Sequence, residues 1–446
     1  MALFVGIDLG STTSKAVVLD EREGILGKGL TNTRSNYEVA ATVAREEALD
    51  DARLALLGRG LAERIGPETD RLTAELRRAW VVSRCVERLH ALGARVAQNA
   101  EKGGSPTDAK AVRSLFEAIE GEADRVFAPL AEDRSRFFRD VVSARFFADA
   151  TEAAQRGALS YEAAVNAYDQ AIVAVENEEA PLPAQARIGT ALARARLEPK
   201  ERTLLEDAWR GLDEKALEVG RYVGTGYGRQ LLPFPKEQIR SEILCHGLGA
   251  HALYPETRTV LDIGGQDTKA IQLDPKGLVL NFQMNDRCAA GCGRYLGYIA
   301  EEMNLGLHEL GPLALSATRA VKISSTCTVF AGVELRDLLS LGERRENILL
   351  GLHRAILLRA MSLLSRSGGV NEQLTFTGGV AKNAAVVHEL RALVEEHYGA
   401  RTINIHADSI YTGALGAALF AKRGGGEGLP VAKRPKRAAA APPVGS

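Results

Sequence analysis

Residues 8–20 read DLGSTTSKAVVLD and residues 262–274 read DIGGQDTKAIQLD, and the two stretches align without a gap. Six of the aligned positions are identical, which is improbable for two unrelated segments. The shared residues that carry chemistry are an aspartate, a glycine and a lysine in each copy: Asp8, Gly10 and Lys15, then Asp262, Gly264 and Lys269. Such a repeat indicates one structural unit that is present twice in the chain.

Each copy has an apolar run rich in β-branched residues, a small polar turn and a second apolar run, which predicts a strand, a tight turn and a strand. A glycine in the turn lets backbone N–H groups approach a phosphate, and hydroxyls add donors. We therefore expect nucleotide phosphates to be bound by Gly10, Ser11, Thr12, Thr13 and Lys15 in the first copy and by Gly264, Gly265, Gln266 and Asp267 in the second.

The aspartate that ends the first strand of each copy, Asp8 or Asp262, is the expected Mg²⁺ site. Mg²⁺ keeps several of its waters and needs few protein ligands, so one carboxylate can hold it through the hydration shell. The alternative is that the two copies are unrelated hairpins whose aspartates face solvent.

A third glycine motif, FTGGVAKN, occupies residues 376–383, between the strand-like QLTF and the helical pattern AAVVHELRALVEEH. Its small residues would let a purine lie against the backbone, which gives four candidate contacts: Gly378, Gly379, Val380 and Asn383. A Gly-Gly turn between a strand and a helix is often only a connector. For the glycines of the later helical stretch at residues 412–423, helix packing is the simpler explanation.

The composition is that of an ordinary soluble protein: of 446 residues 46% are hydrophobic and 25% charged, and 56 basic side chains balance 57 acidic ones. This balance argues against a general nucleic-acid binder. The N-terminus, MALFVGIDLG, lacks the features of a signal peptide, and no stretch of about 18 uncharged apolar residues predicts a membrane span. We expect a cytoplasmic protein without membrane partners, whose five cysteines serve thiol or metal chemistry rather than disulfides.

Taken together, the two hairpins and the third glycine motif resemble the superfamily of actin, sugar kinases and heat-shock chaperones, in which two related halves clasp ATP. Within it, the sequence resembles the BadF/BadG/BcrA/BcrD-type ATPases, namely the ATPase subunits of benzoyl-CoA reductase and the activators of 2-hydroxyacyl-CoA dehydratases. The stretches that carry this resemblance are GIDLGSTTSK, TGYGR at 225–229, CHGLGA at 245–250, DIGGQDTK, FQMNDRCAAGCGRYL at 282–296, SSTCTVFA at 324–331 and TGGVAKN. The resemblance implies an α/β, actin-like and hexokinase-like (duplicated ribonuclease H-like) fold.

Cys288 and Cys327 each precede an apparent helix, and helix N-termini favour thiolates and bound anions. A 4Fe-4S cluster normally needs four cysteines, and the spacing offers no compact set of four. The resemblance implies that both cysteines bind one 4Fe-4S cluster shared with a second subunit, identical or homologous. Without the motif, two buried apolar cysteines would be the simpler explanation. Cys292 is expected not to be a ligand, and Cys85 to lie in a core.

Phosphoryl transfer needs a held metal, a cradled phosphate and an oriented water. Asp8 and Asp262 suit the metal, while Gln266 and Asp267 at the tip of the second hairpin could orient water or contact phosphate. By analogy with the superfamily, Glu242 is a candidate to polarise the water; a solvated glutamate on a helix face is the alternative.

The domain boundaries predicted from these patterns are 1–35 for the first part of the N-terminal half, 36–215 for a mainly helical insertion, 216–258 for the rest of that half and a connecting helix, 259–423 for the C-terminal half, and 424–446 for a disordered tail. The dehydratase activators lack such an insertion, whereas the larger ATPase subunit of benzoyl-CoA reductase carries one. The insertion therefore favours the reductase.

The resemblance implies an ATP-hydrolysing subunit that passes low-potential electrons from ferredoxin, through the shared cluster, to partner subunits that bind and reduce an aromatic acyl-CoA. The first alternative is an activator of a 2-hydroxyacyl-CoA dehydratase. A rival of another class is a small-metabolite kinase, which would need the hairpins but neither cysteine.

Overall fold

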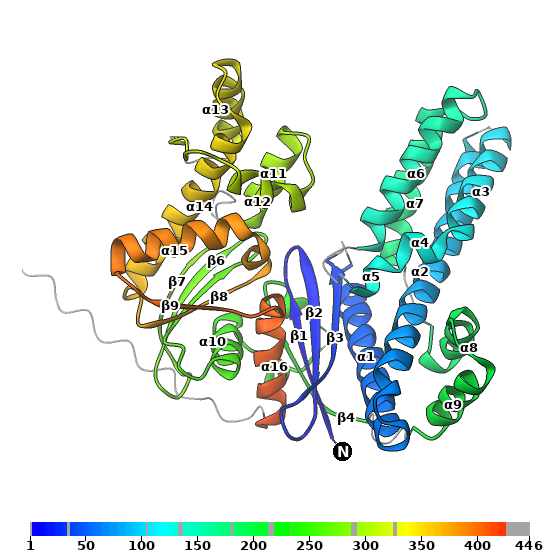
Figure 1. The fold of residues 1–446 in the computed structure, drawn as a ribbon, viewed down its shortest axis with the longest axis horizontal. Helices are drawn as coiled ribbons and strands as arrows, with labels where there is room; N and C mark the ends of the chain where they lie inside the picture. The colour runs from blue at the N-terminus through cyan, green and yellow to red at the C-terminus, as the bar shows by residue number, and fades with distance from the viewer. Residues whose placement is uncertain are drawn as a thin grey trace, which may run out of the picture. The chain divides into compact units, whose positions relative to one another are not determined.

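The computed structural model describes residues 2–33, 36–103, 106–132, 137–178, 182–212, 218–232, 234–286, 292–323 and 328–424. The chain forms two compact units, Met1–Ile239 and Arg240–Ser446, and each contains one β-sheet (Figure 1). The division falls inside the predicted segment 216–258, because its helix belongs to the second unit. Of the predicted tail, all but Gly424 lies outside the described residues.

The first unit is built on a four-stranded sheet with the order β3-β2-β1-β4. Its strands are β1 (Leu3–Leu9), β2 (Thr13–Leu19), β3 (Ile25–Asn32) and β4 (Val219–Thr225). β1 pairs with β2 antiparallel and with β4 parallel, so the strand that carries Asp8 at its end lies inside the sheet. The predicted strand, turn and strand of residues 8–20 are confirmed. The short 3₁₀ turns η2 (Arg229–Leu231) and η3 (Lys236–Gln238) follow β4.

Helix α1 (Tyr37–Ile65) lies directly on β3 because that strand has glycines where the helix passes. A Cβ added to Gly27 would be 2.0 Å from the carbonyl oxygen of Ala48, and one added to Gly29 would be 1.9 Å from that of Ala44. The facing residues of α1 are alanines that belong to the core of the sheet. The first helix of the predicted insertion is therefore part of the core of the ATPase half.

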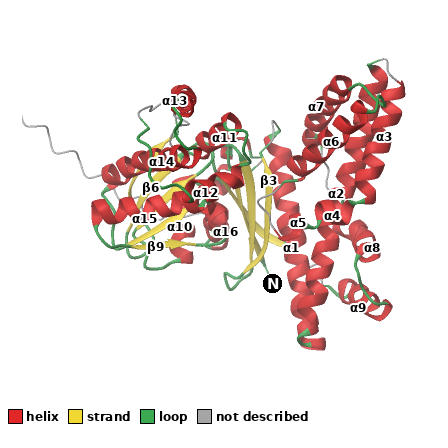
Figure 2. Cartoon of the chain, turned by 45° about the horizontal axis from the view of Figure 1, so that its top comes forward, coloured by secondary structure: helices red, strands yellow, loops and turns green. Residues whose placement is uncertain are grey.

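The other helices of the first unit form a bundle that packs on α1, which we call the helical arm (residues 68–210; Figure 2). They are α2 (Glu68–Lys102), α3 (Pro106–Gly121), α4 (Ala123–Phe127), α5 (Pro129–Glu132), α6 (Phe138–Gln155), α7 (Tyr161–Asn177), α8 (Ala184–Arg194) and α9 (Pro199–Arg210). One apolar core joins α2, α3, α6 and α7 and includes Cys85, as predicted. A second core lies around Trp80 and Trp209, whose ring centroids are 5.3 Å apart.

The second unit is built on a five-stranded sheet with the order β7-β6-β5-β8-β9. Its strands are β5 (Thr259–Ile263), β6 (Thr268–Leu273), β7 (Val279–Asn285), β8 (Gln373–Thr377) and β9 (Thr402–Ile405). β5 pairs with β6 antiparallel and with β8 parallel, which repeats the arrangement of β1, β2 and β4. The second predicted hairpin is thus confirmed as well.

Helices pack on this sheet in two groups. α10 (Glu242–Leu253) packs on β5 and β6, and α16 (Thr412–Lys422) packs on α10. A large apolar core joins the sheet to α11 (Gly293–Glu302), α12 (Leu307–Leu315), α13 (Thr328–Ser340), α14 (Arg345–Ser367) and α15 (Ala384–Tyr398). The 3₁₀ turns η5 (Gly379–Lys382) and η6 (Ser409–Tyr411) connect elements at one end of the sheet.

Helices α16 and α14 test two predictions from the sequence: that the glycines of residues 412–423 serve helix packing, and that the chain has no membrane span. A Cβ on Gly416 would be 1.8 Å from the carbonyl oxygen of Cys245, so this glycine serves helix packing. By length and composition α14 could cross a membrane, but most of its apolar stretch is buried in the core of the second unit. The apolar character of α14 is accounted for by that core.

Candidate functional site

The first hairpin places Asp8 and Lys15 opposite each other on β1 and β2. The Lys15 Nζ lies 3.4 Å from an Asp8 carboxylate oxygen, and the two side chains are only 12% and 5% exposed. At the tip, Ser11 and Thr13 are partly exposed and Thr12 is exposed. The tip thus offers backbone N–H groups and hydroxyls beside a buried carboxylate, which fits a magnesium-bound phosphate.

Thr33, just after β3, holds the backbone of this tip, which we call the first phosphate loop (residues 10–13). The Thr33 hydroxyl donates to the carbonyl oxygen of Gly10 at 2.6 Å, and the Thr33 N–H donates to that of Thr12 at 2.8 Å. The hydroxyls of Thr33 and Ser14 are also 2.9 Å apart. The loop is therefore fixed by a residue that lies outside the repeat.

The second hairpin contains a denser buried cluster. Lys269 is 3% exposed, and its Nζ lies 2.8 Å from an Asp267 oxygen, 3.3 Å from an Asp262 oxygen and 3.7 Å from a Glu242 oxygen. Burial alone would lower the pKa of Lys269, but these three carboxylates raise it well above its usual value. Glu242 is only 8% exposed, so the alternative of a solvated glutamate is wrong.

Asp262 receives two further partners from elements far away in the sequence. His246 of α10 places its Nδ1 3.3 Å from the Asp262 Oδ1, and the Thr377 hydroxyl donates to the same oxygen at 2.9 Å. Burial alone would raise the pKa of Asp262, but His246 and Lys269 together hold it well below its usual value. Asp262 is therefore a buried carboxylate kept in its ionised form, as a metal site requires.

The structure extends the internal repeat to a third strand. In parallel pairing, Thr225 of β4 lies opposite Asp8 and Thr377 of β8 lies opposite Asp262. A glycine with positive φ follows each threonine, at +93° for Gly226 and +90° for Gly378. A Cβ would lie 2.5 Å from the Asp8 carboxylate at Gly226, and 2.3 Å from the carbonyl oxygen of Ile263 and 3.1 Å from the Asp262 carboxylate at Gly378. Each carboxylate is thus approached by a Thr-Gly backbone that tolerates no side chain.

The residues of the third glycine motif, 376–383, lie in two different settings: the glycines beside the second hairpin, and Asn383 at the start of α15. Gly378, Gly379 and Val380 lie directly beyond β8, next to the second hairpin. The Asn383 side chain instead caps α15, since it accepts the N–H groups of Ala385 and Val386.

The amide group of Asn383 also donates to Nε2 of His353 at 3.0 Å, while Nδ1 of the same ring donates to the carbonyl oxygen of Leu349 at 2.7 Å. This arrangement needs a neutral imidazole, and burial lowers the pKa of His353 accordingly. The side chain of Asn383 is therefore occupied within the second unit.

Helix α11 begins on the second hairpin. The N–H of Gly293 donates to the carbonyl oxygen of Gly264 at 2.9 Å, and the N–H of Arg294 donates to that of Gly265 at 2.8 Å. Cys292, which precedes the helix, is fully buried. The predicted ligands Cys288 and Cys327 lie outside the described residues, but the helices expected after them, α11 and α13, are confirmed.

Sequence reasoning placed both hairpins correctly but gave no role to Thr33, Thr225, Gly226, His246 or Thr377. A signal for His246 was present, because Glu242 and His246 are four residues apart in a helical stretch and so share one face. A signal for the Thr-Gly pairs was also present, since TG opens both TGYGR and TGGVAKN. Only the strand register shows that the two TG pairs are equivalent.

A comparison with models of known protein families shows to which family the chain belongs. The sequence model of the BadF/BadG/BcrA/BcrD ATPase family matches residues 5–421. The chain belongs to this family. Its membership confirms the resemblance drawn from the motifs, and ATP binding follows for this member of the BadF/BadG/BcrA/BcrD ATPases.

Curated relatives include dehydratase activators and one component of a reductase. The activator of lactoyl-CoA dehydratase from Anaerotignum propionicum is 44% identical over 207 residues, which are 46% of this chain and 77% of the relative. The (R)-2-hydroxyglutaryl-CoA dehydratase activating ATPase of Acidaminococcus fermentans is 43% identical over 199 residues, 45% of this chain and 74% of the relative. A benzoyl-CoA reductase subunit of Thauera aromatica is 35% identical over 221 residues, 49% of this chain and 78% of the relative.

The fold has a solved counterpart. The crystal structure of component A of the Acidaminococcus fermentans (R)-2-hydroxyglutaryl-CoA dehydratase aligns with a TM-score of 0.55 at 22% identity, over 95% of this chain and 99% of that one. At this identity the likeness concerns the fold alone, and it confirms the predicted actin-like ATPase architecture.

Proposed function

We propose that this chain is an ATP-hydrolysing, electron-activating protein that serves a CoA-ester dehydratase or reductase. The observation that carries the proposal is the pair of hydrogen bonds from α11 to the carbonyl oxygens of Gly264 and Gly265. The segment that contains Cys288 and Cys292 joins the last strand of the β5-β6-β7 meander to this helix. A change at the phosphate-binding turn is therefore passed directly to the cysteine segment.

The groups on the two hairpins divide the work of hydrolysis. Asp8 and Asp262 would hold Mg²⁺ through its waters, and the glycine turns would bind the phosphates. Glu242 and Gln266 are the candidates for orienting the attacking water. Lys269 offsets part of the negative charge of the three carboxylates that it contacts. The protein thus supplies positioning and charge, which dominate phosphoryl transfer.

Cys288 and Cys327 are the proposed ligands of a 4Fe-4S cluster, completed by two cysteines of an identical or homologous subunit. A bound cluster would supply one-electron chemistry at low potential. The N-terminal end of α13, which directly follows Cys327, would favour the negative charge of a thiolate-bound cluster through the helix dipole, whereas the first two N–H groups of α11 donate to Gly264 and Gly265. Reduced ferredoxin is the proposed electron donor.

Two partner classes remain, and a different observation favours each. The helical arm favours a benzoyl-CoA-reductase-type complex, in which partner subunits bind the aromatic acyl-CoA. The higher identity to dehydratase activators, 43–44% against 35% for the reductase component, favours a 2-hydroxyacyl-CoA dehydratase as the partner. In both cases the ATPase and the cluster do the same work.

The test of electron activation is the anaerobically purified protein. We expect bound iron and sulfide, a cluster spectrum that responds to ATP, and loss of both in Cys288→Ala and Cys327→Ala. Cys85→Ala, a change in the core of the helical arm, is the matched control and should keep the cluster. Iron-free protein, or an unchanged spectrum in the two cysteine variants, would contradict the proposal.

A second assay separates the partner classes and the kinase rival. ATP use in constant proportion to reduction of an aromatic acyl-CoA would identify the reductase, whereas substoichiometric ATP use would identify the dehydratase activator. Transfer of the γ-phosphate to a small acceptor, without any cluster, would identify a kinase.

A further inference from the structure

Strand β3 connects the first phosphate loop with the helical arm. At its C-terminal end Thr33 holds the carbonyl oxygens of Gly10 and Thr12. Within the strand, Leu30 lies opposite Lys15, the partner of Asp8. Any displacement of the loop is therefore transmitted to β3, which lies at the edge of the sheet.

The outer edge of β3 is covered by two carboxylates instead of another strand. The N–H of Lys28 donates to Asp51 at 3.0 Å, and the N–H of Leu30 donates to Glu47 at 3.2 Å. Asp51 and Glu47 are four residues apart on α1, so they lie on the same face of that helix. Edge strands normally leave such N–H groups open to pairing with other chains. Here two of them are satisfied from within the unit.

The second oxygen of each carboxylate binds the helical arm. Glu47 uses its other oxygen to pair with Arg84 of α2 at 3.0 Å, and Asp51 uses its other oxygen to pair with Arg77 of the same helix. Each carboxylate therefore joins the sheet edge to α2.

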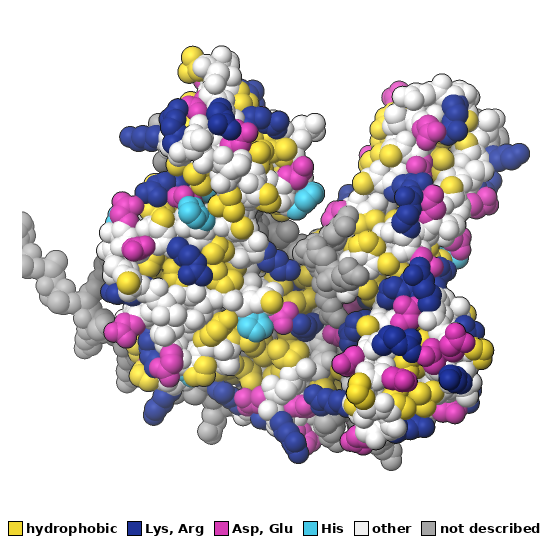
Figure 3. Space-filling view, viewed as in Figure 1, with side chains coloured by type: hydrophobic (Ala, Val, Ile, Leu, Met, Phe, Trp, Pro, Cys, Tyr) yellow, Lys and Arg dark blue, Asp and Glu magenta, His cyan; other side chains and the backbone are white. Residues whose placement is uncertain are grey.

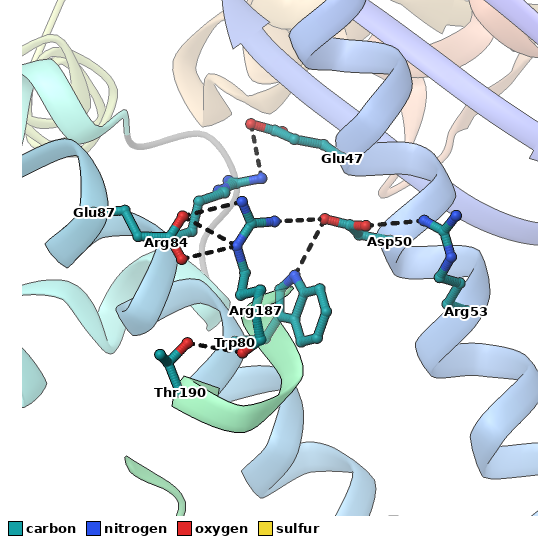
Figure 4. A network of polar contacts seen from close by, with 8 residues as sticks. All are labelled: Glu47, Asp50, Arg53, Trp80, Arg84, Glu87, Arg187 and Thr190. Atoms are coloured by element: carbon teal, nitrogen blue, oxygen red, sulfur yellow. Dashed lines mark hydrogen bonds and ion pairs between the residues drawn. The ribbon is translucent and has the colours of Figure 1, made fainter. Parts of the chain in front are cut away.

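A buried ion network extends this junction to α8 (Figure 4). Arg187 is 1% exposed; it pairs with Asp50 of α1 at 2.9 Å and with Glu87 of α2 at 3.1 Å. The indole N–H of Trp80 also donates to Asp50, at 3.3 Å. Removing one member of a buried pair leaves an uncompensated charge and is strongly destabilising, so the junction holds its members in one arrangement.

A further contact links the start of α1 to the end of α7. The N–H of Asn36, the N-cap of α1, donates to the side chain of Asn177 at the end of α7 at 3.1 Å. The face of the arm seen in Figure 3 carries side chains of both charge signs rather than a single-sign patch.

We propose that Thr33, Glu47 and Asp51 are positioning residues that couple the helical arm to the nucleotide. ATP binding at the first phosphate loop stabilises β3 and, through the two carboxylates, the arm. Because coupling between two sites is reciprocal, a loosened arm weakens ATP binding by the same factor. This inference rests on the proposed ATP-binding function and assigns the arm a role in it.

The primary test uses the unaltered full-length protein. Hydrogen exchange is measured by mass spectrometry without nucleotide and with the Mg²⁺ complex of a non-hydrolysable ATP analogue. We expect exchange to slow several-fold in residues 10–13 and also in α2 and α7. Slowing in residues 10–13 with no change in the arm would overturn the coupling alone. No slowing anywhere would overturn the proposed ATP binding and, with it, this inference.

Variants test the individual residues. Glu47→Gln combined with Asp51→Asn keeps an acceptor for the strand N–H groups but weakens the ion pairs to α2. We expect about tenfold weaker binding of the analogue and loss of its effect on exchange in the arm. Glu101→Gln, which affects an exposed ion pair with Arg113 on the same arm, is the control and should behave as the unaltered protein. Equal behaviour of the double variant and the control would contradict the proposal.

The role of Thr33 is tested by comparing the effects of its substitution on KM and on kcat, and by a conservative variant that keeps the hydroxyl. Thr33→Val removes the hydroxyl that donates a hydrogen bond to the carbonyl oxygen of Gly10. We expect the KM for ATP to rise about tenfold while kcat changes less than about threefold. Thr33→Ser keeps the hydroxyl and should restore KM. If the valine and serine variants behave alike, Thr33 does not position the loop through its hydroxyl.

Discussion

The two repeated hairpins share a sequence pattern but differ in their surroundings. In the first, Asp8 pairs with Lys15, and Thr33 fixes the backbone of the loop. In the second, Asp262 lies within a buried cluster that includes His246 and Lys269. The extra partners come from α10 and β8, which the repeat does not contain.

This difference separates what a duplicated motif carries from what its context adds. Both copies bring an aspartate and a lysine opposite it, and folding places a Thr-Gly backbone from β4 or β8 against each carboxylate. The second copy also keeps the carboxylate of Asp262 ionised, because His246 and Lys269 hold its pKa well below the usual value, and this copy is hydrogen-bonded to α11. We infer that the effect of nucleotide binding is transmitted through the first hairpin to the helical arm and through the second hairpin to the cysteine segment.

The largest expected effect tests the unequal role of the two lysines. Lys269→Met leaves buried carboxylates without their main cation, and we expect the second unit to lose about 3–5 kcal/mol of unfolding free energy. Lys15→Met removes one ion pair, whose lysine is 12% exposed against 3% for Lys269, and should cost the first unit less, about 2 kcal/mol. Urea unfolding, resolved by hydrogen exchange in each unit, measures both. Lys110→Met, at an exposed position, is the control, and equal losses for Lys15 and Lys269 would remove the distinction.

The next effect concerns hydrolysis, for which both hairpins should be needed. Asp8→Asn and Asp262→Asn are each expected to lower kcat/KM for ATP about 100-fold, because each removes the charge that holds the metal. Phosphate release measures this loss.

The repeat provides matched controls in its second aspartates. Asp20 accepts the N–H groups of Arg22 and Gly24, and Asp274 accepts those of Lys276 and Leu278, so both cap a turn. Asp20→Asn and Asp274→Asn should hydrolyse ATP at nearly the unaltered rate. A large loss in these controls would show that the assay reports folding rather than metal binding.

A smaller effect tests whether the Thr-Gly pairs are equivalent. Gly226→Ala and Gly378→Ala each place a methyl group against the aspartate strand at positive φ, and we expect about 2 kcal/mol of destabilisation with weaker ATP binding in both. Gly399→Ala has a positive φ of 74° but would meet no atom within 4 Å, so it should cost about 1 kcal/mol with unchanged ATP binding. Different outcomes for Gly226 and Gly378 would break the equivalence.

The smallest effect is a pH dependence confined to the second unit. Burial lowers the pKa of His353, so the unfolded chain takes up the proton first as the pH falls. Stability should therefore be complete above the unfolded pKa of about 6.5 and fall below it, by at most about 1.4 kcal/mol per pH unit. Melting between pH 7 and pH 5 should show this slope, and His353→Gln should flatten it. An equal slope in that variant would assign the effect to another group.

Much of the fold was predictable because its signals are local. Alternating apolar runs around glycine turns predicted both hairpins, and helical periodicity predicted α11, α13, α15 and the helical arm. The contacts of Thr33 with Gly10 and of His246 with Asp262 were not predictable, since they join residues that become neighbours only after the chain folds. The packing of α1 on the sheet was not predictable for the same reason, because α1 resembles the helices of the arm in sequence.

By itself, the sequence determined that the chain contains a duplicated hairpin, that it belongs to an ATPase family, and that Cys288 and Cys327 precede helices. Only the tertiary structure decided that Thr-Gly backbones complete each hairpin and that the two aspartates have different partners. The physical reason is that turns and periodicity are set by neighbouring residues, whereas a buried carboxylate is stabilised by whichever cations and donors folding brings within about 3 Å of it.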